Sequence, residues 1–245
     1  MRFTMKQMKR LPLVAGLLCC AVGLTAWLGY LGSNPAAFAY PKASGTDVQD
    51  KQTPSAAQAW QRLKAGNNRF AAEMLEKNDL GAARRQELAG GQKPFAIVLT
   101  CADSRLTPEF IFNQGLGDLF VVRVAGNIAD PFVLGSIEYA VEHLHVPLIV
   151  LLGHEKCGAV EAALGEEKPA GNLGKLIGEV SVGKDLPAGK DAALAAAIKN
   201  NVVHQTRLLT ERSDIIKEHV AKKEVRIVSG VYQLASGKVE WLNNE

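Results

Sequence analysis

Outside its first 39 residues the chain lacks a charge excess of either sign, and nowhere does it contain an internal repeat. Four of its 28 Lys and Arg residues lie in residues 1–39, which hold no acid, so the rest carries 24 bases against 25 acids. A net charge of −1 lacks the excess of basic residues that is typical of proteins that bind nucleic acid. A hydrophobic content of 47% with 22% charged residues excludes wholesale disorder and predicts a packed core.

The first 39 residues are predicted to be an export signal. Met1–Arg10 is basic, Leu11–Leu31 is almost wholly apolar, and Ala37-Phe38-Ala39 supplies an A-x-A cleavage site. The apolar stretch is also about as long as a membrane span needs, so an uncleaved anchor facing outside the cytoplasm is the alternative. Cleavage predicts a periplasmic protein, and contact with the membrane is expected only if the segment stays uncleaved.

Residues 40–54 are expected to form a flexible spacer, followed by a single α/β domain over 55–245. A helix is predicted to open at Ser55, with a stripe that packs against the body or a partner subunit and consists of Trp60, Leu63, Asn67, Phe70 and Met74. A second helix is predicted over 81–89. Strand-like runs then alternate with helical patterns, which predicts a mainly parallel β-sheet flanked by helices. The strand-like runs are 95–100, 119–124, 148–152 and 225–229, with a short edge strand over 239–242; the helical patterns fall near 108–113, 132–144, 157–164 and 192–221. Residues 165–190 are expected to be irregular, with one helical turn.

Two polar clusters directly follow two of the strand-like runs. Cys101-Ala102-Asp103-Ser104-Arg105 follows the first run, and Gly153-His154-Glu155-Lys156-Cys157 follows the third. Ligand sites in open α/β sheets lie just beyond the carboxyl ends of strands. Two thiolates, an imidazole and a carboxylate form a ligand set that suits zinc.

The chain has only four cysteines, and two of them, Cys19 and Cys20, lie inside the predicted signal. Once the signal is removed, a disulfide and a metal site compete for the sulfurs of Cys101 and Cys157. His154, three residues before Cys157, favours the metal.

The role of Asp103 depends on Arg105. Cys101, His154 and Cys157 would leave the fourth coordination position to Asp103, which closes a structural site, or to water, which leaves a catalytic one open. A bidentate pair with Arg105 would keep Asp103 ionised and turned away from the metal. Without the flanking cysteine, an ordinary ion pair would be the better interpretation.

At these residues the chain resembles a β-class carbonic anhydrase of the plant-type branch. The family has a Cys-x-Asp-x-Arg segment and a His-x-x-Cys segment about fifty residues later, and here Cys101 and His154 are 53 residues apart. The resemblance extends from about Trp60 to Trp241 and includes the segments 63–70, 117–127, 136–141 and 153–160. It implies that Cys101, His154 and Cys157 bind Zn²⁺, with Asp103 as a fourth ligand only in a closed state. It further implies a catalytic dyad of Asp103 and Arg105, a substrate hydrogen bond from Gln92, and a pocket lined by Phe120 and Tyr139.

The resemblance implies a lyase that hydrates carbon dioxide reversibly to bicarbonate and a proton, by attack of zinc-bound hydroxide. It also implies an obligate homodimer with an N-terminal helical arm that reaches across to the partner, or a higher homo-oligomer. Two alternatives are a hydrolase of carbonyl sulfide or carbon disulfide on the same scaffold, and a non-catalytic zinc-binding protein. Intact Arg105 and Gln92 argue against the second. Glu155 departs from the family's usual small hydroxyl residue and is expected to face solvent.

Overall fold

The structure is a computed structural model that describes residues 53–167 and 169–242. The export signal predicted over 1–39 lies outside the described residues, as does most of the spacer predicted over 40–54. Among the helices of the described part, none has both the length and the hydropathy of a membrane-spanning segment.

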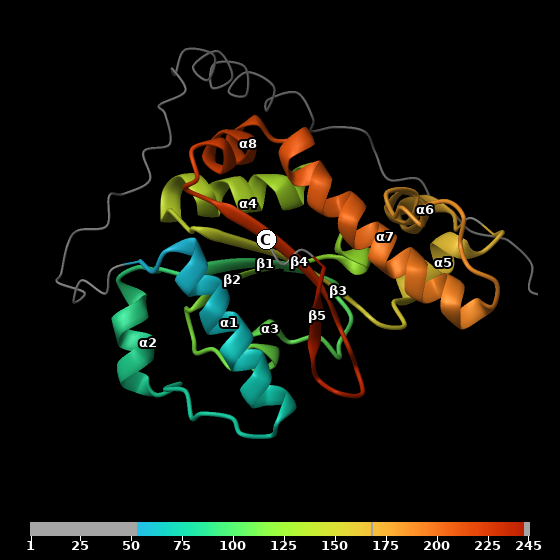
Figure 1. The fold of residues 1–245 in the computed structure, drawn as a ribbon. Helices are drawn as coiled ribbons and strands as arrows, with labels where there is room; N and C mark the ends of the chain where they lie inside the picture. Colours follow the sequence, from blue (N-terminus) through green and yellow to red (C-terminus); the bar gives the residue numbers. More distant parts are fainter. Residues whose placement is uncertain (1–52, 168, 243–245) are drawn as a thin grey trace, which may run out of the picture. The chain divides into compact units, whose positions relative to one another are not determined.

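The centre of the fold is a five-stranded sheet in the order β2-β1-β3-β4-β5 (Figure 1). Its strands are β1 Ala96–Thr100, β2 Leu119–Arg123, β3 Leu148–His154, β4 Arg226–Tyr232 and β5 Val239–Trp241. The first four strands run parallel, whereas β5 pairs with β4 in the antiparallel direction. The predicted mainly parallel sheet is therefore confirmed, including its short edge strand.

Helices cover both faces of this sheet. The helices are α1 Ala56–Ala71, α2 Ala82–Ala89, α3 Pro108–Ile111, the 3-10 helix η1 Ala125–Asn127, α4 Pro131–Leu144, α5 Gly158–Leu164, α6 Gly171–Gly178, α7 Lys190–Glu211 and α8 Asp214–Ala221. In Figure 1, α4, α7 and α8 lie over one face and α1 over the other.

The structure refines two of the helix predictions. The helical pattern near 192–221 is divided between α7 and α8, and Ser213 caps α8 by accepting a hydrogen bond from the Ile216 N–H. The irregular stretch predicted over 165–190 contains the eight-residue helix α6 rather than one turn.

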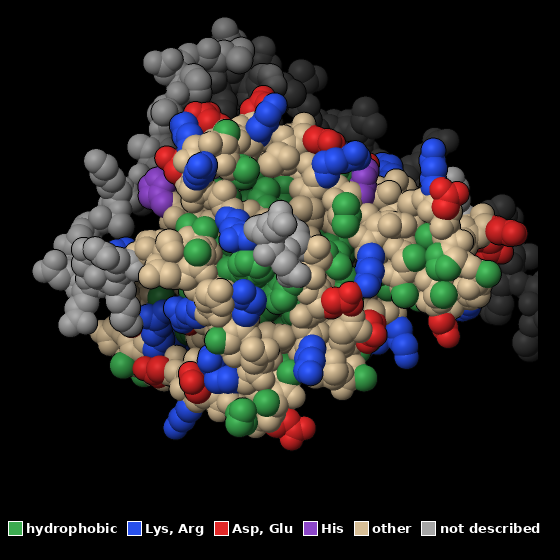
Figure 2. All heavy atoms as spheres, viewed as in Figure 1, with side chains coloured by type: hydrophobic (Ala, Val, Ile, Leu, Met, Phe, Trp, Pro, Cys, Tyr) green, Lys and Arg blue, Asp and Glu red, His purple; other side chains and the backbone are tan. Residues whose placement is uncertain are grey.

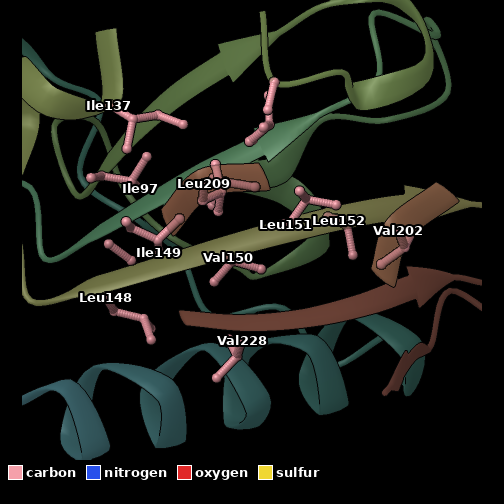
Figure 3. Packing of buried hydrophobic residues seen from close by; sticks show 14 of the residues in the cluster. Ile97, Ile137, Leu148, Ile149, Val150, Leu151, Leu152, Val202, Leu209 and Val228 are labelled. Atoms are coloured by element: carbon pink, nitrogen blue, oxygen red, sulfur yellow. The ribbon is translucent and has the colours of Figure 1, made fainter. Parts of the chain in front are cut away.

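The buried strands send alternate side chains into the two helical layers. Leu148, Val150 and Val228 point toward α1, whereas Ile149 and Leu151 point toward the opposite layer (Figure 3). All five side chains are buried. Because both faces are covered, these strands are continuous apolar runs rather than alternating ones.

Helix α1 packs against the body of its own chain. Trp60 is buried in the core, and the side-chain amide of Asn67 donates to the carbonyl groups of Ile111 and Gly237. The predicted stripe therefore contacts the body, which was one of the two alternatives. Met74 is the exception, because it lies beyond the end of α1 and is 66% exposed.

Charges on the surface are mixed in sign. Figure 2 shows Lys and Arg side chains interspersed with Asp and Glu side chains over one face. Ion pairs at the surface of the described part include Arg62 with Asp118 and Lys199 with Glu240, each 2.6 Å from nitrogen to oxygen. The two signs of charge are therefore mixed over the face shown in Figure 2, in keeping with the near balance of charge in the sequence.

Close contact between α1 and α3 depends on Gly66, because a Cβ there would overlap the carbonyl oxygen of Phe112. We expect Gly66→Ala to lower the free energy of unfolding by about 1–3 kcal/mol through overpacking. A Cβ at Gly135 in α4 would meet no other atom within 4 Å, so Gly135→Ala is the matched control and should raise stability by about 0.5–1 kcal/mol. Urea unfolding followed by circular dichroism measures both, and unchanged stability of Gly66→Ala would contradict the close contact.

Candidate metal centre

Three potential metal ligands converge at the carboxyl edge of the sheet. Cys101 directly follows β1, His154 ends β3, and Cys157 is the N-cap residue of α5. Their donor atoms lie within 4.8 Å of one another and all three residues are buried. The two Sγ atoms are 4.0 Å apart, and both cysteines are free thiols. The two clusters singled out in the sequence therefore form one group.

His154 directs one ring nitrogen toward this group. Its Nδ1 lies 2.8 Å from the carbonyl oxygen of Glu155, to which an Nδ1–H donates. Its Nε2 is buried and has no hydrogen-bond partner among the described residues. A buried polar atom without a partner is unfavourable, and a metal cation would supply the missing partner. Two sulfurs and one imidazole nitrogen are donors that fit zinc.

The two thiols ionise unequally. A hydrogen bond from Cys157 lowers the pKa of Cys101 to about 4, and the backbone N–H of Gly126 donates to the same Sγ at 3.3 Å. The same bond to Cys101, together with burial, raises the pKa of Cys157. A bound divalent cation favours the ionised form of both ligands, because a coordinating thiol is deprotonated.

Asp103 is held by Arg105 rather than joined to the three donors. Arg105 Nε donates to Oδ1 at 2.9 Å, Nη2 donates to Oδ2 at 2.6 Å, and the Arg105 backbone N–H donates to Oδ1 at 3.0 Å. These hydrogen bonds from Arg105 hold the pKa of Asp103 well below its usual range. Asp103 Oδ2 still lies only 3.9 Å from His154 Nε2. The ionised carboxylate of Asp103 therefore lies beside the donor group, and both of its oxygens accept hydrogen bonds from Arg105.

Arg123, to which the sequence analysis assigned no role, tethers the segment that carries Cys101 and Asp103. Arg123 Nε donates to the Cys101 carbonyl at 3.1 Å, and Nη2 donates to the Asp103 carbonyl at 2.6 Å. Arg123 is the last residue of β2 and pairs in register with Thr100. A basic residue at the carboxyl end of a neighbouring strand is the signal that could have located it.

The expectation that Glu155 faces solvent was wrong. Glu155 is half-buried, and its carboxylate accepts a hydrogen bond from the Leu234 N–H at 2.9 Å. Its backbone N–H donates to the Tyr232 carbonyl at 3.0 Å. Glu155 thus joins the segment after His154 to the β4–β5 connection.

The three residues assigned to substrate by resemblance lie toward the other end of β1. Gln92 is exposed in the segment that precedes β1, and Phe120 pairs in register with Ile97 near the start of that strand. The rings of Phe120 and Tyr139 lie 6.4 Å apart between centroids. Within one chain these residues do not join the donor group, so their assignment to substrate stays a prediction.

Comparisons with known proteins agree with one another. The sequence model of the family described as carbonic anhydrase matches residues 96–239. Carbonic anhydrase 2 of Mycobacterium tuberculosis is 44% identical over 185 residues, which cover 74% of this chain and 89% of that protein. The solved structure of the Coccomyxa β-carbonic anhydrase in complex with acetazolamide has a TM-score of 0.60 at 29% identity, and the match covers 73% of this chain and 83% of that one. A structure from the work on two tetrameric β-carbonic anhydrases of Sordaria macrospora has a TM-score of 0.59 at 25% identity, with 76% and 98% covered.

Removal of the guanidinium should shift the ionisation of Asp103. We expect Arg105→Leu to raise the pKa of Asp103 toward the ordinary value of about 3.9, because the bidentate hydrogen bonds are lost. In the wild-type protein the Asp103–Arg105 pair stabilises the fold above about pH 3.9, which is the ordinary pKa of Asp. This stabilisation is lost as the pH falls from that value through the lower pKa of the folded protein. The carboxyl ¹³C shift of Asp103, followed against pH, measures the change. Arg84→Leu, which removes an arginine paired with Glu87, is the control, and an unchanged titration in Arg105→Leu would refute the assigned cause.

Proposed function

The chain belongs to the β-class carbonic anhydrase family, and from this membership we propose that it catalyses the zinc-dependent, reversible hydration of carbon dioxide to bicarbonate and a proton. As a carbonic anhydrase it is an enzyme of the lyase type. The observation that carries the proposal is the Cys101–His154–Cys157 group with the Asp103–Arg105 pair beside it.

Cys101, His154 and Cys157 would hold the zinc ion. When bound, zinc acts as a Lewis acid and lowers the pKa of a coordinated water to about 7. Three protein ligands are the number found in catalytic zinc sites, whereas structural sites have four. The hydrogen bonds from Arg105 to both oxygens of Asp103 support the open arrangement, because they compete with coordination by that carboxylate. They also argue against a non-catalytic site that Asp103 closes permanently.

Asp103 is an ionised acceptor at the edge of the donor group. Its Oδ2 would accept a hydrogen bond from the water that attacks carbon dioxide and so turn a lone pair of that oxygen toward the substrate. Arg105 maintains the charge of Asp103 and fixes its orientation through two parallel hydrogen bonds. The three ligands themselves are buried, which limits the access of bulk water to the group.

We also propose that the working unit is a homodimer or a larger homo-oligomer. Strand β2 is an edge strand, and an unpaired strand edge is a template for pairing with another chain. Its partly exposed side chains are apolar over Leu119–Val122. Gln92, Phe120 and Tyr139 lie away from the donors of their own chain, so a partner subunit would have to bring them to a metal centre. The similar Sordaria macrospora enzymes are tetrameric.

Export to the periplasm is a further proposal, supported by the sequence of residues 1–39 alone. An uncleaved, membrane-anchored form is the alternative. In an oxidising compartment, bound zinc would protect Cys101 and Cys157, because thiolates that coordinate a metal are not free to form a disulfide with each other.

Stopped-flow measurement of carbon dioxide hydration, with zinc content determined in parallel, tests the proposed function. We expect about one zinc ion per chain and hydration activity at neutral pH, because the three ligands form one site. Bound zinc without hydration activity anywhere between about pH 6.5 and 9 would refute the proposal, since the zinc-bound water ionises within that range.

Variants of the same protein separate the roles of these residues. Asp103→Ala and Arg105→Ala should retain zinc and lose turnover by roughly 100-fold or more. Cys157→Ser should lose the metal instead. Asp191→Ala removes an exposed carboxylate of α7 and should change neither property. Loss of zinc from Asp103→Ala would identify Asp103 as a ligand and contradict the open site.

A further inference from the structure

The Gly126 amide that donates to Cys101 belongs to a turn with an unusual backbone. Gly126 in η1 has φ 72° and ψ 11°, and the next residue, Asn127, has φ 45°. Left-handed conformations are unfavourable for residues other than glycine, although Asn tolerates them better than most. A Cβ at Gly126 would approach Val180 Cγ2 to 3.0 Å and Ala159 Cβ to 3.3 Å. The turn therefore depends on its surroundings to keep the N–H directed at the sulfur.

Two side-chain amides of α7 are hydrogen-bonded to the backbone of this turn and of the segment directly after it. Asn201 Nδ2 donates to the carbonyl oxygen of Gly126 at 2.9 Å, and Gln205 Oε1 accepts from the Ala129 N–H at 2.8 Å. Asn201 and Gln205 are four residues apart and so share one face of the helix. Both are 0% exposed.

Further hydrogen bonds fix the orientation of these two amides. Asn201 Oδ1 accepts from the Ser181 N–H at 3.0 Å and from Gln205 Nε2 at 3.3 Å. Gln205 Nε2 also donates to the Glu179 carbonyl at 2.7 Å. Burial of an amide is unfavourable unless it is hydrogen-bonded, and here both amides are bonded at oxygen and nitrogen. Neither side chain can rotate without breaking several bonds.

We propose that Asn201 and Gln205 are positioning residues of the metal centre, which hold the Gly126 N–H against Cys101 Sγ. The inference rests on the proposed zinc site. A hydrogen bond to a thiolate withdraws charge from the sulfur and orients it, and partners of this kind tune a metal through its ligands. Helix α7 thereby acts on the metal centre without supplying a ligand. The sequence signal is a pair of amides, four residues apart, on an otherwise apolar helix face.

Asn201→Leu, compared with Asn200→Leu, tests this role. Asn200 Nδ2 donates to the Val182 carbonyl at 3.0 Å, so the control breaks the same kind of bond from the same helix, but outside the Gly126 turn. Zinc affinity is measured by competition with a chelator. The thiolate-to-cobalt charge-transfer band of the Co²⁺-substituted protein reports on the sulfur itself. We expect Asn201→Leu to weaken zinc binding about 10- to 100-fold and to move the band to lower energy, and Asn200→Leu to change neither.

Unchanged affinity and an unchanged band in folded Asn201→Leu would overturn the inference. Equal changes in both variants would also overturn it, because they would indicate a general effect on α7. If the leucine variant does not fold, Asn201→Asp replaces it, because this substitution keeps the size of the side chain and the Oδ1 acceptor but removes the donor to Gly126. We expect the same weakening of zinc binding and the same move of the band to lower energy. Failure of the wild-type protein to bind zinc would refute the proposed function, whereas zinc binding with unaffected Asn201 variants would refute only the positioning role.

Discussion

The parallel pairing of β1 with β3 is the constraint on which the rest of the structure depends. Thr100 lies in register with Leu152, so Cys101 leaves β1 beside the residues that lead to His154. Thr100 Oγ1 also donates to the Leu152 carbonyl at 2.8 Å. A slip of one residue would turn every side chain of β3 to the opposite face and separate the donors. The buried apolar side chains on both faces make such a slip unfavourable.

Several neighbouring residues and segments hold Cys101, His154 and Cys157 in place. The short connection after β3 contains Lys156 in a left-handed conformation with φ 51° and brings Cys157 back to His154. Arg123 and the Gly126 turn hold the segment after β1. Arg105 keeps Asp103 ionised and holds its carboxylate beside the donors through two hydrogen bonds. A buried dithiol–imidazole group thus lies next to a carboxylate whose charge is already balanced, which is an arrangement suited to an open zinc site.

Local patterns in the sequence predicted most of the elements, and they singled out three residues, Cys101, His154 and Cys157, that the fold brings together. Ser55 was predicted to open α1 and forms a capping box with Gln58. The apolar runs before Cys101 and His154 located β1 and β3, because strands covered on both faces are continuously hydrophobic.

Features that depend on distant partners were harder to predict. The separation of α7 from α8 depends on the Ser213 cap, which the broad helical pattern over 192–221 concealed. Asn201 and Gln205 gain their importance from a turn some 75 residues away in sequence, as the span from Asn201 to Gly126 shows. Gln92 and Phe120 lie toward the other end of β1 from Cys101, His154 and Cys157, and no local pattern around them encodes that placement.

The most direct test of the central claim is a crystal structure of the zinc-loaded protein at neutral pH. The account predicts zinc bound by Cys101, His154 and Cys157 with a water in the fourth position, and Asp103 still paired with Arg105. Coordination of zinc by the Asp103 carboxylate, with Arg105 released, would contradict it.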